Sequence, residues 1–264
     1  MSAPHRSGLI AALFALPLMG LPAQAHFQEI IPSADVLPEG GAVNVEMVFT
    51  HPVEGGPVME MKKPAKLGVL AGGKATDLLG RITEKPVDGK SAWTLAYELK
   101  EPGAAIFYVE PQPYWEPSEG KYIVHYAKVT VDSYASGEGW DALVGLPVEI
   151  QPLTRPTGLW TGNVFTGVVL KGGKPAPFAE VEVEFINDGT VTPPNDAFVT
   201  QVIKADANGT FTYAMPRAGW WGFAALLEGD KPVTSPEGKE VPVEEGALIW
   251  VKATDMGGAA AGGK

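Results

Sequence analysis

The sequence predicts an all-β fold built of two β-sandwich domains, and three observations support this. Short apolar or alternating runs recur along the chain, among them residues 43–49, 93–97, 122–131, 181–185, 197–203, 210–214 and 222–227. Glycine-rich turns separate these runs, and no long stretch has the apolar period of an amphipathic helix. The 32 glycines and 24 prolines are typical of a chain with many turns. We therefore expect antiparallel sandwiches of the immunoglobulin-like and transthyretin-like kinds.

The first 25 residues have the features of a signal peptide. His5 and Arg6 form a short basic start, and the apolar segment 9–21 is too short to span a bilayer. Ala23-Gln24-Ala25 then supplies the small-x-small pattern that a signal peptidase needs. We expect cleavage after Ala25, export to the periplasm, and a mature chain that begins with His26 and has no integral membrane segment. An uncleaved anchor is the alternative.

The mature chain is expected to have two domains and a short tail. A linker punctuated by Pro147, Pro152 and Pro156 predicts a metal-binding sandwich over residues 26–150 and a second sandwich over 151–255. In the second domain, a Gly-Lys-Pro turn at 173–175 and an Asn208-Gly209 hairpin resemble transthyretin-like sandwiches. Residues 256–264 lack apolar content to bury, so we expect a disordered tail there.

Composition narrows the functional classes. The chain has no cysteine, so its core must stabilise it without disulfides. A formal charge of −11 disfavours nucleic acid and anionic lipid as partners, and it suits either cation binding or mere solubility. The sequence contains no nucleophile elbow, zinc-protease motif or phosphate-binding loop. We therefore expect a binding protein and not an enzyme.

The functional prediction depends most on His26. A histidine at the start of a mature chain has a free α-amino group, which can bind one metal ion together with imidazole Nδ1. The unperturbed pKa is about 7.7–8.0 for the amine and about 6.5 for the imidazole, so both lose protons when a metal competes. Neutral nitrogen donors suit nickel, copper and zinc. The alternative is that cleavage leaves a histidine there by chance.

Two further histidines and an acidic loop are candidate partners of His26. His51 lies where a predicted strand ends, and His125 lies in the middle of another; each alone fits a satisfied core or surface imidazole equally well. The loop 108–117 carries Glu110 and Glu116 between stiffening prolines. Glu110 is the preferred carboxylate because it directly follows a strand. The predicted metal ligands are therefore His26, His51, His125 and Glu110.

Methionines suggest a softer metal. Met47, Met59 and Met61 could form a thioether site, and thioethers select Cu(I). The three are not arranged in a methionine repeat, and Met47 alternates like a core residue, so copper is the secondary expectation.

Five long stretches of the chain resemble one bacterial family, the periplasmic substrate-binding components linked to nickel/cobalt uptake transporters of the energy-coupling-factor type. The similarity extends from His26 to about Met256 and is carried by HFQEIIPSADVL, MVFTHPVEGGPVMEMKKP, FYVEPQPYWEPSEGKYIVHYAKV, GWDALVGLPVEIQPLTRPTGLWTGNVFTGVVL and TQVIKADANGTFTYAMPRAGWWGFAAL. The resemblance implies a periplasmic protein that captures Ni²⁺ or Co²⁺ and presents it to a membrane permease. The family's N-terminal histidine and the histidines of its THP and IVHY motifs match His26, His51 and His125.

Three other functions fit parts of the sequence. A periplasmic copper carrier could use the same N-terminal histidine to bind Cu²⁺, which leads the divalent affinity series. A histidine-brace mono-oxygenase would also need an exposed aromatic surface, for which Trp220 and Trp221 are the candidates. A pure adhesion or scaffold module would leave all three histidines dispensable.

Overall fold

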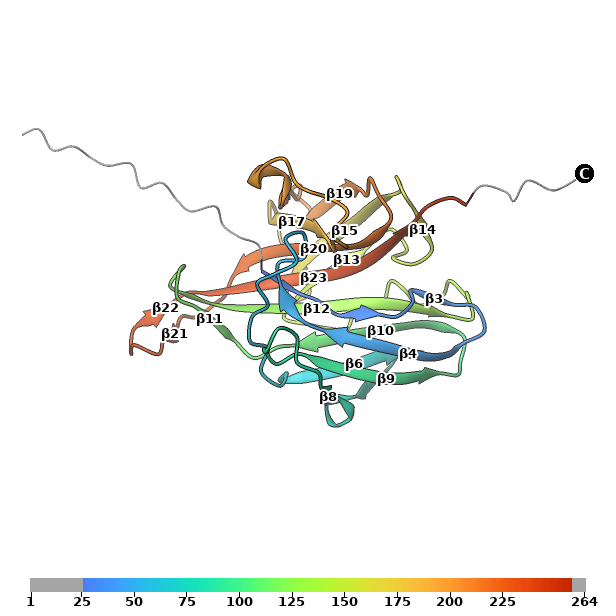
Figure 1. Ribbon diagram of the computed structural model, residues 1–264, viewed down its shortest axis with the longest axis horizontal. Helices are drawn as coiled ribbons and strands as arrows, with labels where there is room; N and C mark the ends of the chain where they lie inside the picture. Colours follow the sequence, from blue (N-terminus) through green and yellow to red (C-terminus); the bar gives the residue numbers. More distant parts are fainter. Residues whose placement is uncertain (1–25, 258–264) are drawn as a thin grey trace, which may run out of the picture.

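A computed structural model describes residues 26–257, and its regular structure is almost entirely β-strand (Figure 1). Within this range the helical elements are two short 3-10 turns, η1 (Leu79–Arg81) and η2 (Asp196–Phe198). The prediction of an all-β chain made of β-sandwiches is confirmed. The predicted signal peptide, and the predicted tail beyond Gly257, lie outside the described residues.

An eleven-stranded sheet forms the centre of the molecule, with β18-β17-β20-β23-β12-β10-β6-β7 as its main order. The short strands β3, β11 and β14 attach to β12 and β23. The strands of this sheet are β3 (Val36–Leu37), β6 (Lys66–Ala71), β7 (Lys74–Asp77), β10 (Gly103–Glu110), β11 (Tyr114–Glu116), β12 (Lys121–Ser133), β14 (Leu159–Trp160), β17 (Glu180–Phe185), β18 (Gln201–Lys204), β20 (Gly219–Glu228) and β23 (Val243–Thr254).

Two four-stranded sheets cover parts of this central sheet. The first has the order β2-β4-β9-β8. In the second, β13, β15 and β16 are neighbours in that order, and β19 also pairs with β15. Their strands are β2 (Ile31–Pro32), β4 (Gly41–Met47), β8 (Thr83–Glu84) and β9 (Trp93–Leu99), and β13 (Val148–Pro152), β15 (Val164–Lys171), β16 (Lys174–Pro175) and β19 (Thr210–Ala214). Two small ladders complete the fold: β1 (Phe27–Gln28) with β5 (Phe49–Thr50), and β21 (Val233–Thr234) with β22 (Glu240–Val241).

The two faces of β23 pack against two different hydrophobic cores. Leu248 and Trp250 belong to the first core, which includes the apolar residues of β4, β9 and β10. Ile249 and Val251 belong to the second core, together with those of β13, β15 and β19. Because successive side chains of a strand point to opposite faces, one strand can serve both cores only if both of its faces are covered. Its near-continuous apolar sequence follows from this arrangement.

The ladder between β12 and β23 joins the two predicted domains. These strands run parallel, with His125 opposite Gly246, so a strand near the C-terminus continues the sheet begun by the first 150 residues. The predicted boundary after residue 150 falls inside β13, whose Val148 and Ile150 lie in the second core. The division into two domains at that residue stays a prediction.

The turn at Asn208-Gly209 differs from its expected role. Asp206 fixes the turn by accepting hydrogen bonds from the amides of Asn208 (2.8 Å) and Thr210 (2.9 Å). The preceding strand β18 pairs with β17, whereas the following strand β19 pairs with β15. The turn therefore carries the chain from the central sheet to an outer sheet and does not close a hairpin.

Between His26 and Gly257, no helical segment has the length and apolar character needed to cross a bilayer.

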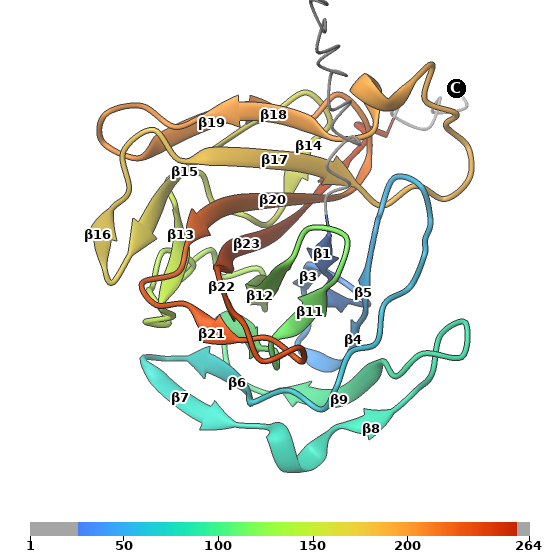
Figure 2. The ribbon, with the colours of Figure 1, turned by 90° about the vertical axis from the view of Figure 1, so that its left-hand side faces the viewer.

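The β1–β5 ladder lies against the central sheet and positions the start of the described chain (Figure 2). The ring of Phe27 packs edge-on against Trp250, with centroids 5.9 Å apart. Gly222 makes room for this contact, since a Cβ there would stand 3.0 Å from Phe27 Cδ1 and 2.8 Å from Trp250. The Trp250 indole also donates to the carbonyl of Gln28 at 2.9 Å. These contacts hold β1 in place, and with it the adjacent His26.

Candidate metal centre

His26 and His51 are brought together by the β1–β5 ladder. Its antiparallel register pairs Phe27 with Thr50, so the next residue on each side, His26 and His51, lie opposite one another. Their ring centroids are 4.7 Å apart, and the side chains are buried, with 9% and 3% exposure. A tight turn directly follows, in which the carbonyl of His51 accepts from the amides of Gly55 and Gly56.

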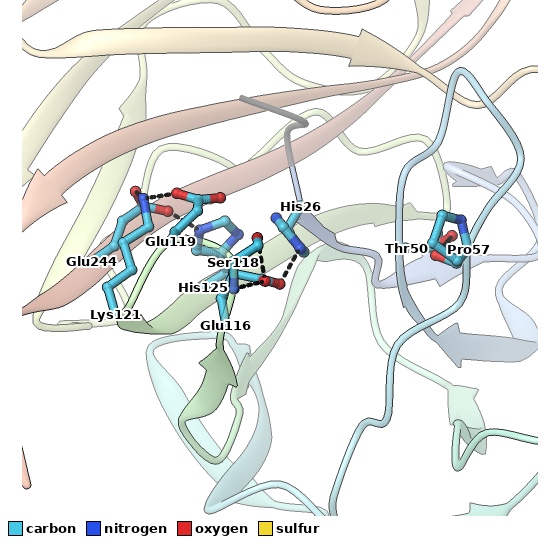
Figure 3. Close-up of polar contacts among 9 residues, drawn as sticks. All are labelled: His26, Thr50, Pro57, Glu116, Ser118, Glu119, Lys121, His125 and Glu244. Atoms are coloured by element: carbon cyan, nitrogen blue, oxygen red, sulfur yellow. Dashed lines mark hydrogen bonds and ion pairs between the residues drawn. The ribbon is translucent and has the colours of Figure 1, made fainter. Parts of the chain in front are cut away.

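Glu116 holds the imidazole of His26 from the other side. Its Oε2 lies 3.1 Å from His26 Nε2, and its Oε1 accepts from the amide of Ser118 at 2.9 Å and from the Ser118 hydroxyl at 2.5 Å (Figure 3). A neutral histidine that donates through Nε2 keeps the lone pair on Nδ1. This is the nitrogen that can form a chelate with the α-amine of the same residue.

The pKa shifts of this pair favour a neutral imidazole beside a carboxylate. Burial lowers the pKa of His26 below its usual 6.5, and the nearby His125 adds to this effect, so that together they outweigh the charges of Glu116 and Glu119. Burial opposes ionisation of Glu116, but hydrogen bonds from Ser118 and the proximity of His26 outweigh it and lower the pKa of that carboxyl. A neutral, oriented imidazole is the form that binds a metal ion.

His125 is linked to a second carboxylate in the same manner. It lies on β12 with 2% exposure, and its Nε2 is 3.3 Å from Oε1 of Glu244 on β23 (Figure 3). Lys121 joins Glu244 to Glu119 through contacts of 2.5 and 2.6 Å. Burial opposes ionisation of Glu244, but His125 and Lys121 outweigh it and lower its pKa to about 2. Within residues 26–257, the Nδ1 atom of His125 has no hydrogen-bond partner.

Phe49 packs against both of these imidazoles. Its ring centroid is 5.7 Å from that of His26 and 6.0 Å from that of His125. Tyr114 on β11 completes the apolar surroundings, 6.1 Å from His26 and 5.2 Å from Phe49. The candidate centre is therefore a largely dry site, in which charges interact more strongly than they do in water.

Glu110 lies apart from the three histidines. It ends β10, and its carboxylate contacts Lys66 Nζ at 3.0 Å. Val109 pairs with Ala127 and shares the face of the first core with it. Strand alternation therefore turns Glu110 to the opposite face from His125, which is two residues before Ala127. The structure places Glu116 next to His26 in its stead. The sequence signal for Glu116 is its Glu-x-Ser spacing, which lets Ser118 fix the carboxylate.

Side chains alone do not complete a metal centre in this structure. In the described part of the chain, no three His, Asp or Glu side chains are close enough together to hold one ion. His26 and His51 supply two imidazoles, so a third donor has to come from another group. The α-amine of His26 is such a group once the peptide bond before it is cut, and Ala25 lies outside the described residues.

The methionines and tryptophans singled out in the sequence lie in different parts of the fold. Met47 is fully buried in the first core, while Met61, with 3% exposure, lines a small cavity beside His125. Trp221 is buried in the second core, and Trp220 packs partly buried against the first. The two tryptophans therefore do not form the exposed aromatic surface that a mono-oxygenase acting on a polysaccharide would need.

The chain has weak similarity to several solved structures. They include trypsin-activated alpha-2-macroglobulin from Escherichia coli (12% identity, 91% of this chain and 16% of that chain, TM-score 0.24). Dimeric latent PorU from Porphyromonas gingivalis has 12% identity over 87% of this chain and 20% of that chain, with a TM-score of 0.24. A two-domain fibronectin type III segment of chicken tenascin has 11% identity over 87% of this chain and all of that chain, with a TM-score of 0.22. The chain thus spans a fifth or less of the first two structures.

No curated protein matches this sequence significantly. A family match, in contrast, covers most of the chain, from residue 23 to residue 229, and therefore includes His26, His51, Glu116 and His125. The family is described as a domain of unknown function, DUF4198, and the chain belongs to it.

Proposed function

We propose that this protein binds a divalent transition metal in the periplasm, Ni²⁺ or Co²⁺, and delivers it to a membrane uptake permease. The observation that carries the proposal is the placement of His26. The first residue of the predicted mature chain is buried 4.7 Å from His51, between ring centroids, and Glu116 holds its Nε2. The contact with Glu116 orients the ring of His26, and the contact with His51 places a second imidazole beside it.

Three nitrogens form the proposed donor set. The α-amine and Nδ1 of His26 chelate the ion, and the imidazole of His51 approaches it from the facing strand. Glu116 does not bind the metal itself but interacts with the ligating histidine. A carboxylate on the nitrogen that does not bind the metal fixes the tautomer of the imidazole and raises its basicity. Nitrogen donors of this type suit nickel and its neighbours in the first transition row.

The acidic side chains around the centre support capture and release. Glu116, Glu119 and Glu244 lie near His26 and His125, and Lys121 compensates only part of their charge. The remaining negative charge raises the local concentration of cations. A site made of amine and imidazole nitrogens also releases its metal when these groups are protonated. Such a site can bind tightly in free solution and still hand its ion on.

The deciding experiment compares two forms of the protein that differ at the N-terminus. The processed form beginning at His26 and a form with one extra glycine before His26 are titrated with Ni²⁺ by calorimetry in a buffer that does not chelate metals. We expect one Ni²⁺ per processed chain and loss of most of the affinity in the extended form. Equal thermal unfolding midpoints without metal would show that the extension leaves the fold intact. Equal affinity in the two forms would overturn the N-terminal chelate.

Copper is the second candidate, because the same three nitrogens suit the tetragonal geometry that Cu²⁺ prefers. Affinity in vitro does not separate the two metals, since Cu²⁺ binds most nitrogen sites more tightly than Ni²⁺. The metal content of the processed protein, isolated from periplasm of cells supplied with both metals, does separate them. Nickel uptake by cells that lack the protein then tests delivery: unchanged uptake would contradict the carrier function.

A further inference from the structure

A small cavity lies beside the candidate metal centre and has a different chemical character. Its volume is about 10 Å³, which is enough for a single atom or water molecule. Phe49, Tyr114 and Ile123 form part of its apolar wall. Polar or polarisable groups are supplied by Gln28, Met61, Gln112 and His125, and the exposed, oppositely charged Glu60 and Lys62 also line the cavity.

His125 lines this cavity and carries a ring nitrogen that has no hydrogen-bond partner in the described chain. The residue is 2% exposed, its Nε2 is next to Glu244, and its Nδ1 has no hydrogen-bond partner in the described chain. A buried nitrogen without a partner costs free energy, so a native structure normally supplies one. Gly246 shows which way the ring lies: a Cβ at this glycine would be nearest to Cδ2, Cγ and Nε2 of His125. Nδ1 therefore lies on the ring edge turned away from β23.

Met61 brings a thioether to the same cavity. Its side chain is 3% exposed, and its backbone is anchored by the Trp93 indole, which donates to the Met61 carbonyl at 2.9 Å. The amide nitrogen of Gln28 lies 3.3 Å from Sδ, but it also donates to the carbonyls of Glu29 at 3.0 Å and Val48 at 3.1 Å. An amide group has two hydrogens, and carbonyl oxygens are better acceptors than sulfur. Sulfur has two lone pairs, so at least one lone pair of Sδ remains available beside the hydrogen bond from Gln28.

We propose that this cavity is a second metal site, which binds one soft monovalent cation of the Cu(I) class between His125 Nδ1 and Met61 Sδ. Thioether sulfur selects soft ions, and an imidazole with a thioether is a poor donor set for Ni²⁺ or Co²⁺. The cavity has room for one ion without its hydration shell. Glu244, on the far nitrogen of His125, orients the ring and contributes a compensating negative charge. The site uses neither the α-amine of His26 nor His51, so it does not depend on the proposed nickel function.

Silver(I) is the probe of choice, because it is soft, monovalent and redox-inert. The processed protein, with its methionine methyl groups labelled with ¹³C, is titrated with silver nitrate in chloride-free buffer and followed by NMR and calorimetry. We expect one equivalent of Ag⁺ to shift the Met61 methyl resonance and to leave that of Met47 in place. The form with an extra glycine before His26 should bind Ag⁺ equally well while losing most of its affinity for Ni²⁺. A failure of the proposed Ag⁺ site can therefore be distinguished from a failure of the proposed nickel site.

Two variants complete the test. Met61→Leu preserves the volume of the side chain and removes the sulfur, one of the two proposed ligands, so it should abolish most of the Ag⁺ affinity. Met59→Leu is the matched control, since Met59 is also buried but does not line the cavity, and it should bind like the unmodified protein. An unshifted Met61 methyl group, or equal loss of affinity in both variants, would overturn the proposal and leave the cavity as a site for a single water molecule.

Discussion

Glu116 and His26 are 90 residues apart in the sequence and meet at 3.1 Å between Oε2 and Nε2. The contact joins the predicted start of the mature chain to the short strand β11. It also decides which ring nitrogen of His26 is available to a metal, because the nitrogen held by the carboxylate is not the one that can chelate with the α-amine. Glu116 is therefore a positioning residue for the proposed centre.

Substitution of Glu116→Gln should weaken Ni²⁺ binding by about tenfold to a hundredfold, the usual cost of losing a carboxylate behind a ligating histidine. The amide keeps the size of the side chain but does not stabilise the polarised imidazole. Glu110→Gln is the matched control, because Glu110 pairs with the exposed Lys66 on the other face of the sheet. Calorimetric titration of both variants measures the difference. An unchanged affinity in Glu116→Gln would remove this residue from the site.

The strands were predictable because each leaves a local pattern in the sequence. The run 122–131 predicts a strand that the structure extends to Lys121–Ser133, and the run 210–214 coincides with β19. Their partners were not predictable, since the pairing of β12 with β23 joins residues far apart in the chain. The run 197–203 forms a strand only in its second part, where β18 begins at Gln201. Its start lies in the 3-10 turn η2, because the side chain of Asn195 accepts from the amide of Ala197.

The same limit applied to the site. The three histidines could be singled out because histidine is rare in this sequence. The choice between Glu110 and Glu116 depends on which face each strand presents, and that is set by pairing with β12 and not by local sequence. The cavity beside His125 was also beyond prediction, because Met61 lies in the segment between β5 and β6 and His125 lies on β12, far away in the sequence.

Glu182 should make the protein less stable as pH rises. Burial, with the charges of Glu244 and Glu184, raises its pKa from 4.5 to about 8. A raised pKa means that the folded state holds the proton more tightly, so the stabilisation is fully present below pH 4.5 and is lost as pH rises through about 8. Each pKa unit corresponds to about 1.4 kcal/mol, which makes the total effect a few kcal/mol.

Urea denaturation at pH 5 and pH 8.5 measures this effect. Glu182→Gln should remove much of the loss of stability between the two pH values, and the remainder is expected from Glu29 and Glu184, whose pKa values are raised to about 8 and about 7. Glu98→Gln, at an exposed position on β9, should behave like the unmodified protein. A pH profile that is the same with and without Glu182 would contradict the prediction.

The buried pair Lys128–Glu149 should respond unequally to removal of its two partners. Nζ and Oε1 are 2.6 Å apart, and the side chains are 2% and 4% exposed. Glu149 also accepts from the amides of Val144, Gly145 and Leu146, whereas Lys128 depends on Glu149 for its compensating charge. Burial lowers the pKa of Lys128 and Glu149 opposes this shift, so loss of the carboxylate leaves a buried ammonium group without compensation.

We therefore expect Glu149→Ala to destabilise the fold by about 3–5 kcal/mol and Lys128→Met to have a smaller effect. Loss of the exposed pair Lys85–Glu46, through Lys85→Met, should cost less than about 1 kcal/mol. Free energies of unfolding in urea give all three values. Equal costs for the two buried substitutions would show that the backbone amides around Glu149 do not compensate its charge.

Gly246→Ala should separate the two proposed metal sites. A Cβ at this position would stand 2.3 Å from Cδ2 and 2.8 Å from Nε2 of His125, so the imidazole has to move. Overpacking of this kind costs about 1–3 kcal/mol of stability, and the displaced Nδ1 should no longer bind Ag⁺ beside Met61. Ni²⁺ binding should persist, because its proposed donors are His26 and His51. Gly80→Ala, where an added Cβ meets no atom within 4 Å, is the control for the substitution itself. If Gly246→Ala abolishes the binding of both metals, His125 belongs to the nickel centre and there is one site. If it affects neither, His125 binds no metal.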